Sequence, residues 1–193
     1  MNNITSKSRQ STFSSSINSM KHVKDSKTIL LLNNNLGEIY ASKISYILKR
    51  INMKNESQKL SYSNSNSCKA KHLKYFELLS APALSFEKYL NKLVFPLTSD
   101  SSTIVYSLIL LDRFINSGLI INETNQHLSF FISFIIATKL QEDLIYEEHI
   151  YCKYGGLTKL ALAKLEKIFL ESIDYNIYVT AKEYNFYLKN FCN

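Results

Sequence analysis

The sequence of 193 residues contains no tryptophan, only two prolines and only four glycines. Proline and glycine are the residues that most often interrupt a helix, so their scarcity favours an α-helical fold. Long apolar runs are also missing. The longest lies within residues 124–143 and has about half of the roughly 20 residues that a membrane span requires, so no membrane segment is expected.

Cysteine is nearly as sparse. The three cysteines are odd in number and far apart, which excludes a C-x-x-C metal pair and a disulfide framework; they are Cys68, Cys152 and Cys192. The first residues lack the apolar core of a signal peptide. We therefore expect a protein of a reducing intracellular setting, in the nucleus, the cytoplasm or both.

The short motifs of common enzyme sites are absent too. The sequence has no G-x-x-x-x-G-K-[ST], no G-x-G-x-x-G, no G-x-S-x-G and no H-E-x-x-H. His149 and Cys152 are spaced as half of a metal site would be, but no second pair accompanies them. The acidic pairs at 142–143 and 147–148 are typical of a solvated surface. We expect no catalytic residue, no metal and no cofactor.

Charge is distributed unevenly along the chain. Of the net +7, residues 1–80 contribute +9 (13 Lys/Arg against 4 Asp/Glu) and residues 81–193 contribute −2 (10 against 12). Residues 1–28 are rich in Ser, Asn and Lys, which predicts a solvated, largely disordered arm. The apolar spacing of residues 37–53 predicts a short amphipathic helix that packs on the domain or meets a partner. A polar stretch then divides a basic arm, 1–70, from a folded domain, 71–193.

The folded domain reads as a succession of helices. Within the central one, 124–143, every residue from Leu128 to Ala137 is apolar except Ser129 and Ser133. A helix without a wide polar face is predicted to be buried on nearly all sides. Five shorter helices are predicted around it, at 86–95, 104–115, 146–154, 158–170 and 180–191. The expected N-caps are Ser85, Ser101 or Ser102, Thr124 or Asn125, and Thr158.

Asp112 stands inside an otherwise apolar helix. A buried carboxylate is costly unless a cation or several donors accompany it. Arg113 is adjacent in sequence and points to a different face, so Lys92 on the preceding helix is the favoured partner. The alternative is that Asp112 is simply exposed.

Several segments of the domain together resemble one known family. The segments are A-P-A-L-S-F-E-K-Y-L-N-K-L (81–93), Y-S-L-I-L-L-D-R-F-I (106–115), A-T-K-L-Q-E-D (137–143), K-Y-G-G-L-T (153–158) and L-E-K-I-F-L-E-S-I-D-Y-N-I-Y-V-T (165–180). In order and spacing they are similar to a cyclin box. The Gly-Gly turn followed by a capping Thr resembles the single-box P-type cyclins, also called phosphate-pathway-like or U-type.

The resemblance implies an all-α cyclin box with five short helices around a buried one, and no enzymatic activity of its own. Its partner would be a cyclin-dependent protein kinase, which would supply ATP, magnesium and phosphoryl transfer. Neither a membrane nor a small-molecule substrate is implied, and binding of nucleic acid is not favoured. The residues that match the family's kinase contacts are Lys139, Glu166, Ile136, Leu170 and Tyr175.

The resemblance also implies that Lys92 and Asp112 form the family's ion pair between its first two helices. Lys92 replaces the usual Arg, so a bidentate grip on Asp112 is lost. Tyr175 stands where Phe is common and adds a hydroxyl. A different interpretation is a cyclin-box-like helical adaptor in transcription whose basic arm binds nucleic acid. The slightly acidic domain argues against it.

Overall fold

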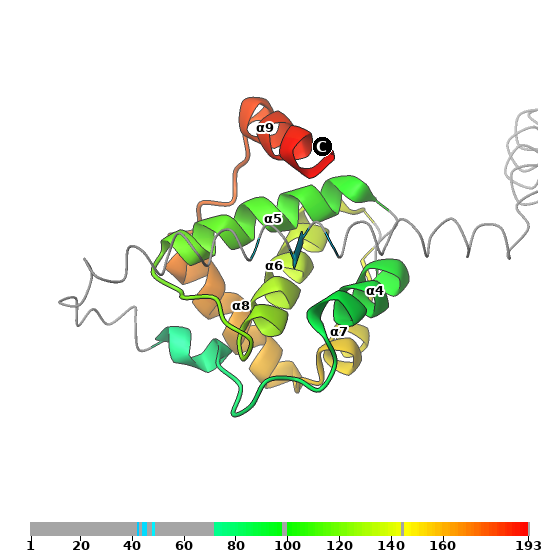
Figure 1. The fold of residues 1–193 in the computed structure, drawn as a ribbon, viewed down its shortest axis with the longest axis vertical. Coiled ribbons are helices and arrows are strands. Elements are labelled where there is room, and N and C mark those ends of the chain that lie inside the picture. Colours follow the sequence, from blue (N-terminus) through cyan, green and yellow to red (C-terminus); the bar gives the residue numbers. More distant parts are fainter. Residues whose placement is uncertain are drawn as a thin grey trace, which may run out of the picture. The chain divides into compact units, whose positions relative to one another are not determined.

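The fold is that of a computed structural model (Figure 1). It describes Ser42, Ile44, Ser45 and Leu48, and then residues 72–97, 100–143 and 145–192. From residue 72 on, these ranges hold a short 3-10 helix, six α-helices and no strand, which confirms the all-α prediction. The elements are η2 (Lys74–Phe76), α4 (Phe86–Leu97), α5 (Ser101–Asn116), α6 (Gln126–Gln141), α7 (Glu148–Gly155), α8 (Lys159–Ser172) and α9 (Ala181–Cys192).

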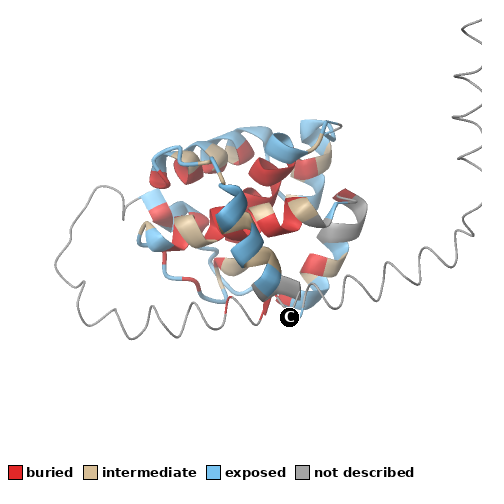
Figure 2. Ribbon diagram, turned by 90° about the horizontal axis from the view of Figure 1, so that it is seen from above, coloured by how far each residue is buried: buried red, intermediate tan, exposed pale blue. Residues whose placement is uncertain are grey.

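Helix α6 is the centre of the domain. All of its residues from His127 to Thr138 are buried, as the apolar run predicts. Helices α4, α5, α7 and α8 pack against it, and the most extensive contact is with α5. Two of its hydroxyls donate to carbonyls of the same helix, Ser133 to Phe130 and Thr138 to Phe134, so they are satisfied without water. Figure 2 shows the buried residues gathered inside the surrounding helices.

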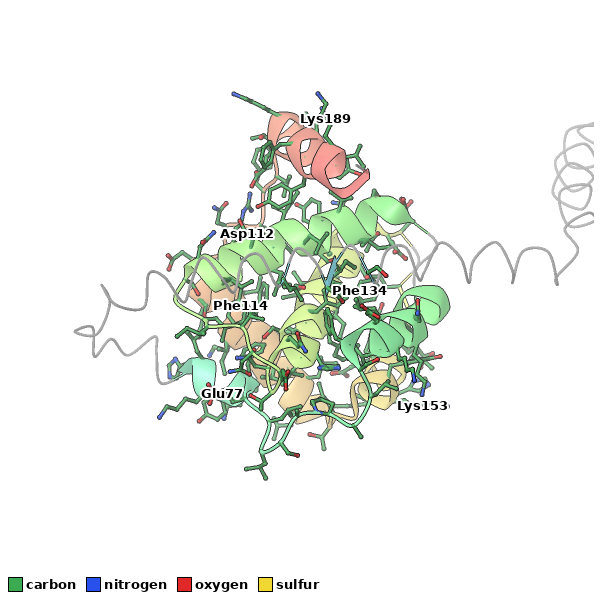
Figure 3. The ribbon with its side chains drawn as sticks, in the orientation of Figure 1. Glu77, Asp112, Phe114, Phe134, Lys153 and Lys189 are labelled. Atoms are coloured by element: carbon green, nitrogen blue, oxygen red, sulfur yellow. The ribbon has the colours of Figure 1, made fainter. Side chains whose placement is uncertain are left out.

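Aromatic side chains connect the outer helices to this centre. Phe114 of α5 stacks on Phe169 of α8 with ring centroids 4.4 Å apart. Phe114 and Phe134 both project into the interior (Figure 3). Helix α7 approaches α6 so closely that a Cβ on Gly155 would run into the ring of Phe131. Only glycine fits there, which gives the Gly-Gly turn a packing reason.

The helix ends follow the predicted capping in part. Ser85 and Thr158 accept the backbone N–H of Lys88 and Ala161, at 3.4 and 3.2 Å. Asn125 occupies the N-cap position of α6. The prediction for α5 was wrong by one residue, because Asp100 rather than a serine accepts the N–H of Ser102, at 2.8 Å. A carboxylate suits the positive end of the helix dipole.

Residues upstream of the predicted domain boundary contribute to the core. Of the predicted helix 37–53, the four residues that are described are helical, and Ile44 and Leu48 are 0% and 2% exposed within the main core. A compact unit runs from Gly37 to Asn193. Part of the segment assigned to the arm therefore belongs to the domain, whereas the predicted disordered arm, 1–28, lies outside the described residues.

Truncating Ile44 should test this upstream packing. Ile44→Ala removes three fully buried carbon atoms and should lower the free energy of unfolding by about 2–5 kcal/mol. Ser42→Ala is the matched control, because Ser42 is exposed on the same segment. Urea denaturation of both variants measures the difference. An unchanged urea midpoint for Ile44→Ala would show that the segment around Ile44 is not part of the folded core.

His127 is a buried ionisable group at the start of α6. Its Nε2 lies 3.0 Å from the Leu84 carbonyl oxygen and must donate to it, while the rings of Phe86 and Tyr89 face its own ring edge-on. Burial lowers the pKa of His127 below its ordinary value of 6.5, and the hydrogen bond to Leu84 opposes part of that shift. The folded protein therefore holds His127 neutral.

This lowered pKa predicts a loss of stability in acid. The neutral form stabilises the fold above the ordinary pKa of 6.5, and that contribution is lost as the pH falls below it, because the unfolded chain then binds a proton that the folded chain resists. His127→Gln keeps an amide donor for Leu84 and does not titrate. Between pH 6.5 and 5, the unfolding free energy should fall more steeply for the wild type than for this variant. Parallel slopes in urea denaturation would contradict the buried neutral state.

Candidate functional site

The site begins where α6 reaches the surface. The helix is buried through Thr138, and Lys139 is its first exposed residue after that run. Its side chain is 40% exposed in the last turn, where a cation also suits the negative end of the helix dipole. The position of Lys139 thus follows from the length of the apolar run that precedes it.

Glu166 comes to the same place from α8. Its Oε1 lies 2.5 Å from the Lys139 Nζ, although 27 residues separate the two along the chain. The Glu166 side chain is 18% exposed, so the carboxylate is less open to water than the ammonium. The structure therefore brings together two of the residues that the resemblance selects, in a charge-assisted hydrogen bond.

Ile136 and Leu170 lie one helical turn away from this pair, on α6 and α8 respectively. Ile136 precedes Lys139 by three residues and is 5% exposed. Leu170 follows Glu166 by four residues and is half-buried against the core. Residues three and four apart share one face of a helix, so each charged residue has an apolar neighbour on its own helix.

Tyr175 follows α8 and differs from the others in its exposure. Its side chain is 59% exposed, and its backbone is left-handed with φ of 54°, as is that of Asp174 with φ of 52°. The Tyr175 N–H donates to the Leu170 carbonyl at 2.8 Å, which closes the end of α8. A left-handed conformation is unfavourable for a bulky residue. The backbone thus presents an aromatic ring to solvent at an energetic cost.

Asp112 has partners other than the predicted Lys92. The Tyr187 hydroxyl donates to its Oδ2 at 2.6 Å and the Asn116 amide donates at 3.2 Å. Asp112 lies on the side of α5 that faces α9 (Figure 3), whereas Lys92 is exposed on α4. Burial and the bond to Asp112 both raise the pKa of Tyr187, so its hydroxyl stays a donor. The carboxylate does have donors, but the donor from another helix is Tyr187, which ties α5 to α9 and not to α4.

Arg113 and Tyr106 are residues that sequence reasoning missed. Arg113 binds the carboxylate of Glu183 on α9. The side chains of Arg113 and Tyr106 also donate to backbone carbonyls of the segment between α8 and α9. The sequence argument weighs Arg113 only as a partner for Asp112, to which its different face makes it unsuited. The useful signal was that an arginine in an apolar helix needs a partner of its own.

The remaining candidate groups form no reactive cluster. In the described ranges no three or more His, Cys, Asp and Glu side chains lie close enough together to hold a metal ion. His149 pairs with Glu147, with Nδ1 3.0 Å from Oε2. Burial raises the pKa of Tyr151, and the nearby carboxylates of Glu142 and Glu166 raise it further. Among the helices that the structure describes, none has the length and apolar character to cross a membrane.

Sequence comparison identifies the family. The sequence model of the cyclin family matches residues 39–177, which include α6, α8 and the pair between Lys139 and Glu166. The chain belongs to the cyclin family. The match begins within the predicted helix 37–53, in agreement with the burial of Ile44 and Leu48.

Individual cyclins from plants and yeast are similar to this chain. Cyclin-U4-3 of Arabidopsis thaliana is 29% identical over 157 residues, which cover 79% of this chain and 68% of that protein. Cyclin-P4-1 of Oryza sativa subsp. japonica is 29% identical over 107 residues, which cover 54% of this chain and 50% of that protein. The PHO85 cyclin-like protein psl1 of Schizosaccharomyces pombe is 26% identical over 115 residues, which cover 58% of this chain and 47% of that protein. The matched region thus spans about half of the last two relatives.

The left-handed backbone at Tyr175 predicts an unusual response to mutation. Tyr175→Asn should raise the free energy of unfolding by about 1 kcal/mol, because asparagine tolerates this conformation and the exposed ring has little packing to lose. Tyr178→Asn is the control, since Tyr178 is 76% exposed without a positive φ, and should show no gain. Chemical denaturation measures both. A less stable Tyr175→Asn variant would mean that the packing of the ring contributes more free energy than the left-handed backbone costs.

Proposed function

We propose that this cyclin is the regulatory subunit of a cyclin-dependent protein kinase, which it binds and activates. The observation that supports the proposal most is the surface pair of Lys139 and Glu166, which joins two helices at the positions that the resemblance matches to the family's kinase contacts. Relatives named as U-type and P-type cyclins favour the single-box P-type branch. Their names give no support to the alternative role as a transcription adaptor.

The pair has hydrogen-bonding capacity to spare. A lysine ammonium has three donors, and Lys139 uses one of them on Glu166. A carboxylate has two oxygens, and Glu166 uses Oε1. Lys139 can therefore donate to a backbone carbonyl of the kinase, and Glu166 can accept a backbone N–H, while the two keep each other oriented.

Apolar neighbours would complete the contact. Interface hot spots are typically a few apolar or aromatic anchors whose polar neighbours satisfy backbone groups at the edge. Leu170 offers apolar surface beside the pair and Tyr175 offers an exposed ring, whereas Ile136, at 5% exposed, can add only a small apolar area. We assign these five residues to one docking surface for the kinase.

Activation would be a shift of population. A cyclin that binds the active kinase conformation more tightly than the inactive one moves the equilibrium toward the active form. ATP and magnesium would be bound by the kinase, and the cyclin would perform no chemical step of its own. This role would be carried out inside the cell, in the nucleus, the cytoplasm or both.

Single alanine variants should test the docking surface. Lys139→Ala or Glu166→Ala leaves a backbone group of the kinase buried without a partner on docking. Hydrogen bonds to charged groups contribute roughly 1.5–3 kcal/mol, so affinity should fall about tenfold or more. Binding is measured with the cyclin-dependent kinase that co-purifies with the full-length chain from its own cells, then reconstituted from purified components.

The controls are Lys189→Ala and Glu123→Ala, which remove the same charges from exposed positions elsewhere, Lys189 from α9 (Figure 3). Circular dichroism must accompany every binding measurement, since lost helicity would explain lost binding. Folded Lys139→Ala and Glu166→Ala proteins that bind and activate the kinase as the wild type does would refute the assignment of these residues.

A further inference from the structure

Three successive carbonyl groups between α8 and α9 accept hydrogen bonds from side chains of α5. Arg113 Nη1 donates to the Asn176 oxygen at 2.7 Å, and Arg113 Nη2 donates to the Tyr178 oxygen at 2.9 Å. Between them, the Tyr106 hydroxyl donates to the Ile177 oxygen at 2.5 Å. With three successive carbonyls fixed in this way, residues 176–178 have little freedom to rotate. We call Tyr106 and Arg113 the α5 clasp.

Helix α9 fixes the orientation of the clasp. Arg113 Nη2 lies 2.9 and 2.8 Å from the two carboxylate oxygens of Glu183, in the first turn of α9. The Arg113 and Glu183 side chains are 15% and 32% exposed, so water only partly screens the pair. Thr180 accepts the Glu183 N–H at 3.2 Å, which fixes the start of the helix that carries the carboxylate.

Electrostatics supports the same arrangement. Burial raises the pKa of the Tyr106 hydroxyl, the positive charge of Arg113 lowers it, and the negative charge of Glu183 raises it again. All three groups therefore lie within electrostatic reach of one another. At neutral pH the Tyr106 hydroxyl keeps its proton and remains a donor to Ile177.

The first carbonyl that the clasp binds, that of Asn176, belongs to the residue directly after Tyr175. The Tyr175 N–H is held by the Leu170 carbonyl of α8, and the Tyr175 carbonyl accepts the Ile177 N–H, also at 2.8 Å. A bulky residue keeps a left-handed backbone only where surrounding contacts over-determine it. Restraint from α8 on one side and from α5 on the other provides such contacts for Tyr175.

We propose that Arg113 and Tyr106 are positioning residues that hold Tyr175 ready to dock on the kinase, and that Glu183 of α9 acts on the same site through Arg113. The inference rests on the proposed function, since it takes the kinase as the partner of Tyr175. It adds three residues outside the five of the proposed docking surface and gives α9 a part in docking.

A role limited to holding α9 on α5 makes a different prediction. In that case, loss of the clasp would loosen α9 and leave kinase affinity unchanged while the domain stays folded. If the clasp acts through Tyr175, its loss lowers affinity only while the Tyr175 ring is present. A double-mutant cycle measures this dependence directly.

The experiment uses the full chain with Tyr106→Phe, Arg113→Lys and Glu183→Gln, each alone and combined with Tyr175→Ala. Tyr106→Phe removes one hydroxyl and keeps the ring, so it remains informative if the Arg113 variant fails to fold. Arg113→Lys keeps the charge and loses the fork that reaches two carbonyls. Affinity for the purified kinase is measured beside amide exchange at Tyr175 and Ile177 in the free protein.

We expect each clasp variant to weaken kinase binding about fivefold and to speed amide exchange at Tyr175 and Ile177 by a similar factor, since one or two hydrogen bonds are lost. Combined with Tyr175→Ala, the same substitutions should change affinity less than twofold. Lys139→Ala should weaken binding in every background.

Two outcomes would overturn the inference. One is faster exchange with unchanged affinity, which would make the clasp a structural tie alone. The other is a Tyr175→Ala variant that binds as the wild type does, or that loses the same further affinity when the clasp is also removed. If Lys139→Ala weakens binding in those cases, the proposed kinase docking stands and only the positioning role fails. If Lys139→Ala also has no effect, the proposed docking surface itself is wrong.

Discussion

The structure depends on one constraint, which is that α6 has no polar face. A helix buried from His127 to Thr138 must be covered on every side, because exposing any face would leave large apolar side chains in water. Four helices, α4, α5, α7 and α8, provide that cover. The close approach of α7 leaves no room for a side chain at residue 155, and the stacking of Phe114 on Phe169 joins α5 to α8. These details of packing follow from the need to enclose one helix.

The same constraint decides where a functional surface can form. A fully enclosed helix can present side chains to a partner only at its ends. Lys139 lies where α6 reaches the surface. Helix α8, which covers α6, contributes Glu166 to the same site. The charged pair is thus built on two rigid helices, and its geometry is set by the core beneath it. A partner that binds there meets groups that are already oriented, which lowers the entropy lost on association.

Much of this architecture could be predicted from the sequence, because the helical period and the apolar run of α6 carry strong local signals. The proximity of Lys139 and Glu166 could not, since nothing local links residues 27 apart, and it was expected only through the resemblance to cyclins. The error over Asp112 has a related cause. The sequence does not tell which face of α5 is covered by α9, so the hydrogen bond from Tyr187 to Asp112 could not be predicted. For residues 37–53 the apolar spacing predicted a helix that packs on the domain or meets a partner, and the burial of Ile44 favours the first of these.

The segment after α8 shows why some features leave no trace in sequence patterns. Left-handed backbone is usually signalled by glycine, asparagine or aspartate; Asp174 fits that signal, yet Tyr175 adopts the same conformation here. In the proposal made above, this conformation is held by the Leu170 carbonyl, which binds the Tyr175 N–H, and by the α5 side chains, which bind the carbonyls just after Tyr175. When residues distant in sequence hold a backbone conformation, the local sequence need not favour it, so a local pattern does not predict it. If tertiary hydrogen bonds offset the cost of this conformation as proposed, the aromatic residue of the proposed docking surface, Tyr175, depends on contacts of α5 and α9 that lie outside that surface.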